Sequence, residues 1–435
     1  MTFITASTGL ATATIQSAID AISAVGGGRV TLAPGEHATG GLVLRSGVDL
    51  HLTDGAVLRP LADYDAYRGN EVGVIAEGSD RAIIRAKGAK DIAITGPGKI
   101  IAPGAAYIIG EDASVGTYTP AQYRPRVLVF ENCDGVRLDG ITVEDSPMWT
   151  LHLVACTDVS VTQVTVANNE RLPNTDGLVI DSCSDVSIEN VAISTADDGV
   201  CLKTSRQGDV IGVCKNVAVR HCRVASQSCA LKIGTESFGD FDNIVFEDCR
   251  VLRSNRGLGI FSRDGGTISN VRFSRIALEC HETADGFWGS GEALTITLDD
   301  RRASRPAGAV SGVVIEDITG TMEGAINIVS TGRAAITDIR MSRIRISQRP
   351  GALGTGRCYD MRPTSADLAP AGHLAGRANA WVRGEDGGIV GLVPYPGGMP
   401  GLYAPGIAGL VLEDVMLERA TPLPNGWNST AIVAD

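Results

Sequence analysis

Residues 174–203 of the chain read NTDGLVIDSCSDVSIENVAISTADDGVCLK. Two short runs in this stretch, Gly177–Ile180 and Val186–Ile193, alternate apolar and polar residues as half-buried strands do. Asp176 and Asp198 are 22 positions apart, which is close to the length of one coil in a parallel β-helix. Because successive coils are about one strand spacing apart, ~4.8 Å, the two aspartates are expected to stack on one face. The stretch therefore predicts an all-β fold of the parallel β-helix type.

The same stretch gathers three carboxylates, Asp176, Asp197 and Asp198, that packing does not require. Adjacent residues of a regular strand point to opposite faces, so both members of the Asp-Asp pair can serve one site only at a bend, which Gly199 favours. The simpler interpretation is turn chemistry, since Asp and Asn often precede Gly where strands end. The spacing of the acids, and Lys203 after them, favour a site. Crowded carboxylates raise one another's pKa, so one can stay protonated while another is ionised.

A degenerate repeat extends the pattern along the chain. Its first four copies begin at Cys133, Cys156, Cys183 and Cys214, which are 23, 27 and 31 residues apart. A period of this size built from short strands indicates stacked coils, and the missing LxxLxL consensus argues against leucine-rich repeats. The Asn or Asp of each copy is expected in a turn, with the preceding Cys or aliphatic residue pointing into the stack.

The two ends of the chain differ from the repeats. Thr14–Ala24 places four apolar residues on one helical face and is followed by three glycines, so we expect a short helix that caps the stack. We predict a single domain, 1–435, with an N-terminal cap at 1–28, coils at 29–350 and a loop-rich C-terminal region at 351–435. Within that region, Ile407–Leu417 is expected to form a last strand pair over the end of the stack.

Composition excludes several classes of partner. The net charge of −12 argues against nucleic acid or an acidic membrane surface, and no apolar run approaches the ~18 residues of a membrane span. The first residues lack a secretory signal, so a cytoplasmic protein is expected, or a secreted one if this chain is a mature form. The ten cysteines are then reduced and act as small apolar fillers, and without a CxxC pair they indicate no metal site. The oligomeric state is left open.

Four motifs follow one another in the order of a known family. They are RPRVLVF at 124–130 followed by Asn132-Cys133, SPMWTLH at 146–152, NTD at 174–176 and DD at 197–198. In this order they resemble glycoside hydrolase family 28, the polygalacturonases and related pectin hydrolases. The resemblance implies a right-handed parallel β-helix and hydrolysis of an α-linked pectic poly- or oligosaccharide with inversion at the anomeric carbon, with no cofactor or metal.

The resemblance also implies roles for the acids. Asp197 would protonate the leaving oxygen, while Asp176 and Asp198 would hold the attacking water. Asn174 would support this group and bind substrate. Further candidates for contact with the substrate are His152, one coil before Asp176, together with Lys203, Lys232, Arg256, Arg263 and Trp288. The alternative interpretations are structural. His152 would be a hydrogen-bonded structural residue, the lysines and arginines would be solvated surface charges, and Trp288 would anchor its loop.

The sequence departs from the family at two points. Gln227–Cys229 stands where the family usually has Gly-His-Gly, and Gly259–Phe261 stands where it usually has Arg-Ile-Lys. Lys232, Arg256 and Arg263 are the cations available in their place. Two other functions remain open at this stage. One is a polysaccharide lyase or epimerase on the same fold, in which the aspartates could bind calcium. The other is a non-catalytic carbohydrate-binding solenoid.

Overall fold

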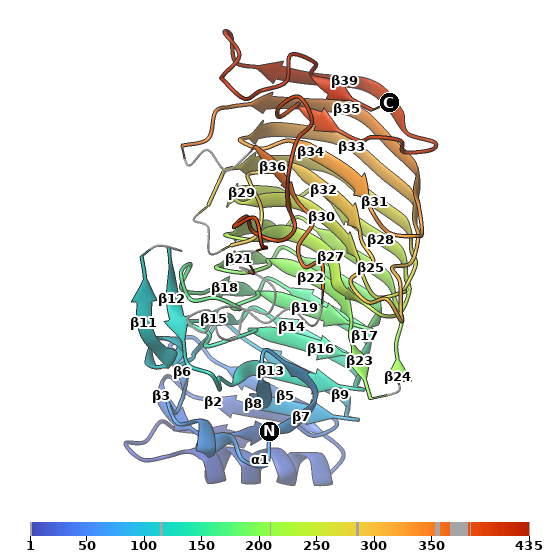
Figure 1. The fold of residues 1–435 in the computed structure, drawn as a ribbon. Coiled ribbons are helices and arrows are strands. Elements are labelled where there is room, and N and C mark those ends of the chain that lie inside the picture. The colour runs from blue at the N-terminus through green and yellow to red at the C-terminus, as the bar shows by residue number, and fades with distance from the viewer. Residues whose placement is uncertain are drawn as a thin grey trace.

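The chain winds into a parallel β-helix. The computed structural model describes residues 2–113, 116–208, 210–283, 287–352, 357–365, 382 and 384–434. Figure 1 shows the coils stacked from the N-terminal helix α1 (Thr12–Ala24) at one end to the C-terminal strands at the other. The predicted all-β solenoid with one short N-terminal helix is confirmed. No helix in the described ranges is both long and apolar enough to cross a bilayer.

Two sheets run the length of the stack, and each coil adds strands to both. Sheet A has 21 strands: β1 (Thr2–Ile4), β2 (Gly28–Leu32), β3 (Gly35–Thr39), β5 (Val48–Leu52), β6 (Ala56–Pro60), β9 (Lys90–Thr95), β10 (Lys99–Ile101), β14 (Asp134–Asp139), β15 (Thr142–Glu144), β17 (Thr157–Thr162), β18 (Thr165–Ala167), β20 (Ser184–Glu189), β21 (Ala192–Thr195), β25 (Cys214–Arg220), β26 (Arg223–Ser226), β28 (Phe241–Glu247), β29 (Arg250–Ser254), β31 (Ile268–Cys280), β33 (Val310–Met322), β35 (Ile336–Gln348) and β39 (Val411–Arg419).

Sheet B has 13 strands and carries the candidate site. They are β4 (Leu42–Val43), β7 (Glu71–Ala76), β8 (Ser79–Lys87), β13 (Arg126–Glu131), β16 (Leu151–Val154), β19 (Leu178–Asp181), β22 (Val200–Thr204), β27 (Cys229–Ser237), β30 (Arg256–Ser262), β32 (Leu294–Leu298), β34 (Ile326–Ser330), β38 (Leu402–Tyr403) and β40 (Ile432–Val433). The short elements outside the sheets are the 3-10 helices η1 (Tyr64–Tyr67) and η2 (Gly104–Tyr107), and the hairpins β11 (Ile108–Asp112) with β12 (Thr117–Pro120), β23 (Arg206–Gln207) with β24 (Val210–Ile211), and β36 (Cys358–Asp360) with β37 (Leu392–Pro394).

The register of sheet B determines which side chains face the core and which face the candidate site. One ladder of fully buried aliphatic residues points inward, and its members pair directly from coil to coil: Leu151, Leu178, Val200, Leu231 and Leu258. The next residue along each strand belongs to the opposite face, where Val179 pairs with Cys201 and Cys201 with Lys232. Apolar burial therefore fixes which side chains of sheet B face outward.

The repeated Asn and Asp residues lie at kinks within strands of sheet A. Asp158, Asp185, Asn216 and Asn243 have φ values between 51° and 58°, in the left-handed region that Asn and Asp tolerate better than most residues. The pairing register skips these positions. The Asn216 side chain donates to Asp185 Oδ1 over 2.8 Å, and Asn243 donates to Asn216 Oδ1 over 2.9 Å. The predicted turn is thus a left-handed kink inside a strand, repeated in register from coil to coil and supported by a side-chain ladder.

The two ends of the stack are covered in different ways. Helix α1 buries Ile15, Ile19 and Ile22 against the first coil. At the other end, Ile407–Leu417 does not form the strand pair that was predicted. Its second half belongs to a single strand, β39, which pairs with β35 on one side and, among the described residues, has no strand on its other side. Pro370 and the residues around it in the loop-rich region lie outside the described part.

All ten cysteines lie in the described part, and all are free thiols. Nine are buried and Cys358 is half-buried. Because a thiol reagent must reach the sulfur, we expect at most one thiol to react quickly in the native protein and ten after unfolding without reductant. A chromogenic thiol titration measures both numbers, and Cys358→Ser should remove the fast phase. Fewer than ten thiols in the unfolded chain would contradict this assignment.

Candidate active site

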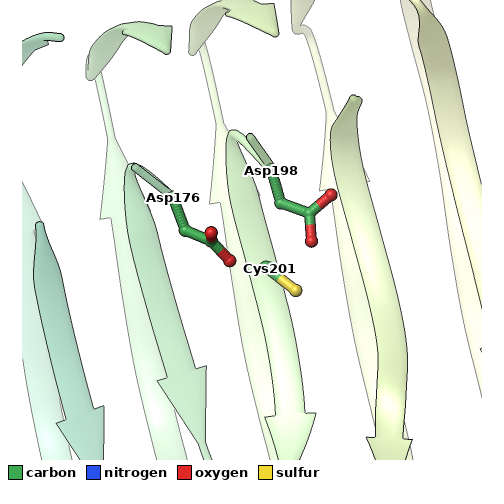
Figure 2. A group of neighbouring side chains, drawn as sticks. All are labelled: Asp176, Asp198 and Cys201. Carbon is green, nitrogen blue, oxygen red and sulfur yellow. The ribbon is translucent and has the colours of Figure 1, made fainter. Parts of the chain in front are cut away.

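A cleft lies on the outer face of sheet B, over the turns that lead into β19, β22 and β27. Its empty volume is about 650 Å³. Figure 2 shows Asp176 and Asp198 projecting to the same side from the turns before two neighbouring strands, with the sulfur of Cys201 beside them. The cleft is lined by thirteen residues: Glu77, Trp149, Asn174, Asp176, Asp197, Asp198, Lys203, Ser228, Lys232, Thr235, Glu236, Phe287 and Trp288.

The three predicted acids meet in this cleft. Asp176 and Asp198 are almost fully buried, at 3% and 2% exposure. Asp197 accepts hydrogen bonds from two backbone N–H groups, that of Asn174 over 3.2 Å and that of Asp198 over 3.0 Å. Asp198 Oδ2 accepts from the Lys232 ammonium at 2.6 Å. Each carboxylate therefore has its own surroundings, which allows the three to differ in protonation.

Backbone pairing between coils sets the positions of the acids. Gly177 N–H donates to the Asp198 carbonyl over 2.8 Å, so the turn that carries Asp176 rests on the turn that carries Asp198. A Cβ on Gly177 would lie 2.8 Å from the Gly199 carbonyl oxygen, and one on Gly199 would lie 2.5 Å from the Ala230 carbonyl oxygen. The glycine after each acid therefore allows neighbouring turns to approach closely.

Electrostatics favour retention of protons in the cleft. Burial raises the pKa of Asp176 well above its ordinary range, and the negative charges of Asp197 and Asp198 raise it further. Burial also raises the pKa of Glu77 to about 7, with a contribution from Glu236. Burial lowers the pKa of Lys232, but the neighbouring acidic groups, Asp198 first among them, together outweigh this effect and the net shift is upward. Near neutral pH the cleft thus holds both protonated and ionised carboxyl groups.

Four of the seven predicted substrate-binding residues line the cleft: Asn174, Lys203, Lys232 and Trp288. The Lys203 ammonium lies 2.6 Å from Glu236 Oε2 and 4.8 Å from the centre of the Trp149 ring. Asn174 has a φ of 60°, and its side-chain oxygen accepts from the Arg124 guanidinium over 2.8 Å. The two lysines are therefore held by cleft carboxylates, while Asn174 supports Asp197 through its backbone.

His152 does not line the cleft, contrary to our expectation. It is fully buried behind Trp149, whose ring it meets edge-on at 5.0 Å. Arg126 donates to its Nδ1 over 2.8 Å, and its Nε2 lies 3.4 Å from Asp181 Oδ2. Burial lowers the pKa of His152 to about 4, so it stays neutral at physiological pH. Its placement gives it a structural role behind the site.

Arg256 and Arg263 are also buried away from the cleft lining. Arg256 Nη2 lies 2.8 Å from Asp360 Oδ2, and its Nε lies 3.5 Å from Glu292 Oε2. Arg263 donates to backbone carbonyls, including those of Thr297 and Met361. Because both guanidinium groups bind protein groups inside the fold, we do not expect them to contact a substrate in the cleft.

Several lining residues were not predicted. Trp149 and Ser228 belong to turns stacked directly beside those of the acids, so the coil register could have found them. Phe287 adjoins Trp288 in the Gly-rich loop, whose first residue, Gly286, lies outside the described part. Glu77 comes from the turn between β7 and β8, almost a hundred residues before Asp176, and no sequence signal connects the two.

Among the described residues, the surroundings of Asp176 and Asp198 disfavour calcium. Ligand atoms of Asp176, Asp198 and Cys201 lie within 4.8 Å of one another. However, Lys232 already occupies one oxygen of Asp198, and burial raises the pKa of Cys201 well above its ordinary range, so its thiol stays protonated and donates to the Gly234 carbonyl at 3.1 Å. Calcium requires 6–8 oxygen ligands, which this group does not supply.

Comparison with known proteins relates this geometry to a family. Residues 70–362 match the model described as glycosyl hydrolases family 28. A probable polygalacturonase of Arabidopsis thaliana is 26% identical over 265 residues, covering 57% of this chain and 54% of that protein. An endo-polygalacturonase of Pectobacterium carotovorum subsp. carotovorum is 23% identical over 368 residues, covering 80% and 86%. The structure of a Thermotoga maritima exopolygalacturonase superposes with a TM-score of 0.64 at 22% identity, covering 78% and 84%.

Asp360 anchors the loop that brings Trp288 to the cleft. Its Oδ2 accepts from the Gly289 N–H over 3.0 Å and lies 2.8 Å from Arg256 and 2.9 Å from Arg362. Burial opposes ionisation of Asp360, but the positive charges of the two arginines lower its pKa to about 2. A carboxylate from the C-terminal region thus links the loop to strand β30.

Replacing this carboxylate should destabilise the protein strongly. Asp360→Asn removes a buried negative charge that pairs with two buried arginines, and breaking a buried ion pair typically costs about 3–5 kcal/mol. The exposed pair between Arg340 and Glu413 offers a matched control. Glu413→Gln is expected to cost less than about 1 kcal/mol. Denaturant unfolding of both variants measures the difference, and equal losses would contradict the anchoring role.

Proposed function

The chain belongs to the glycosyl hydrolases of family 28, and on this premise we propose that it hydrolyses α-linked pectic poly- or oligosaccharides with inversion at the anomeric carbon. The observation that carries the proposal is the convergence of Asp176, Asp197 and Asp198 in one cleft. The relatives named above are polygalacturonases, which supports a pectic substrate. We assign the chain to a divergent branch, because Gln227–Cys229 and Gly259–Phe261 depart from the family's usual motifs.

Inverting hydrolysis needs one carboxylic acid to protonate the leaving oxygen and a carboxylate to activate water on the other face of the sugar. Following the match of motifs, Asp197 is the acid, and Asp176 with Asp198 holds the water. Two observations support the role of Asp198. The Lys232 ammonium lies 2.6 Å from Asp198 Oδ2 and holds that oxygen in place, and Asp198 Oδ1 is buried with no hydrogen-bond partner among the described residues, which leaves a lone pair for water.

The raised pKa of Asp176 adds a requirement to this scheme. In the free protein, burial and the charges of Asp197 and Asp198 favour a proton on Asp176, whereas the scheme needs Asp176 ionised and Asp197 protonated when substrate is bound. The alternative is that Asp176 itself protonates the leaving group. Since the two assignments place the acid on different residues, substrates with good and poor leaving groups distinguish them.

The proposed activity can be tested with a defined panel. The purified protein is incubated with polygalacturonan, rhamnogalacturonan and xylogalacturonan, and new reducing ends are quantified. Proton NMR of the first product gives its anomeric form, which is expected to be opposite to that of the substrate. An ultraviolet-absorbing unsaturated product would instead identify a lyase, and retention of configuration would exclude the inverting scheme.

Replacing Asp197 tests its role directly. Asp197→Asn keeps the shape but removes the transferable proton, so the natural substrate should turn over at least ~100-fold more slowly, within the ~10²–10⁴-fold range of general acid catalysis. The loss should be smaller for a substrate with an activated leaving group. Asp158→Asn is the control, because Asp158 is exposed and Asn accepts its left-handed backbone. If Asp176→Asn rather than Asp197→Asn shows the leaving-group dependence, the acid is Asp176.

A further inference from the structure

The charges that line the cleft carry information about its substrate. Five carboxyl groups, those of Glu77, Asp176, Asp197, Asp198 and Glu236, surround two ammonium groups. Each ammonium is already paired with one of these carboxylates at 2.6 Å, Lys232 with Asp198 and Lys203 with Glu236. We infer that the glycosyl unit in this cleft is uncharged, and that a sugar with a free carboxylate is disfavoured. This inference rests on the proposed function and specifies its substrate class.

The arginines near the cleft are already engaged by protein groups. Arg256 and Arg263 are buried and engaged inside the fold, as described above. Arg301 lies within hydrogen-bonding distance of Asp264 and 3.9 Å from Glu236. The Arg124 guanidinium donates to two backbone carbonyls and to Asn174. A substrate carboxylate would therefore have to displace a protein group from one of these cations.

The protonation of the cleft indicates the same substrate class. Burial raises the pKa of both Asp176 and Glu77, and neighbouring carboxylates contribute to each shift. An additional carboxylate from a substrate would add to this repulsion. Even when these two groups carry protons, three carboxyl groups remain against two ammonium groups.

The rest of the lining suits a neutral sugar. Trp288 is half-buried and provides aromatic surface on which the C–H face of a sugar ring can pack, and the buried Trp149 and Phe287 complete an aromatic wall. Ser228 and Thr235 provide hydroxyl groups that can pair with sugar hydroxyls. A hexose, a deoxyhexose or an esterified uronic acid meets these groups without bringing a charge.

Three matched oligosaccharides test the inference. They are α-1,4-linked oligogalacturonic acid, its methyl ester and its carboxyl-reduced form, which share ring stereochemistry and linkage and differ at C6. Both kcat/KM and the dissociation constant are measured for each. We expect the two uncharged forms to be preferred by about tenfold or more, because the acid would enter a negative, poorly solvated cleft. The preference should shrink as salt screens the repulsion.

A variant of the cleft provides a second readout. Glu236→Gln removes one negative charge and releases the Lys203 ammonium, so the relative kcat/KM for the free acid should rise by about tenfold. Glu418→Gln makes the same change on β39, at an exposed position in sheet A, and should leave the ratio unchanged. Equal or better cleavage of the free acid by the wild type would overturn the inference and leave the proposed function standing. If the protein neither binds nor cleaves any of the three, and also fails to cleave the rhamnogalacturonan and xylogalacturonan of the panel above, the proposed function itself is overturned.

Discussion

Parallel backbone pairing between successive coils is the constraint on which the rest of this molecule depends. In sheet B the pairing aligns an inward aliphatic ladder from Leu151 to Leu258, and the same register places Cys201 and Lys232 on the outer face. A shift of one residue would exchange the two faces. It would carry the Lys232 ammonium into an apolar core, where an unpaired charge is very costly. The energetics of the core thus hold the chemical groups of the cleft in place.

The cleft itself opposes stability. Bringing Asp176, Asp197 and Asp198 together in a buried place costs desolvation and repulsion, which the ion pair with Lys232 offsets only in part. The surrounding fold supplies the remaining stabilisation through residues that do not line the cleft. His152 between Arg126 and Asp181 supports the floor under Trp149, and Asp360 holds the loop that carries Trp288. Polar and charged residues behind the site therefore hold it rigid, while those in the cleft are the candidates for chemistry.

This division explains which features were predictable from sequence. The period of the repeat and the alternation within strands indicated the stack, and one coil length between Asp176 and Asp198 indicated that they meet. The position of an individual cationic side chain could not be predicted in this way. Arg256 and Arg263 follow the acids at distances that suit the cleft, yet their partners come from Asp360 and Met361, about a hundred residues later. Glu77 was missed for the same reason, because a hairpin outside the coil period delivers it.

The open side of β39 bears on how the molecule behaves at high concentration. A solenoid grows by adding strands to its last coil, and an exposed strand edge invites a neighbouring chain to continue that growth as a fibre. Val411 and Met416 of β39 are exposed and would favour such contact. The same strand carries Glu413, Asp414 and Glu418, of which the first two pair with Arg340 and Arg345 of β35, and two copies meeting edge to edge would have to accommodate these charged side chains at the contact. Charged side chains at the terminal rung thus oppose polymerisation of a fold whose own assembly is repetitive.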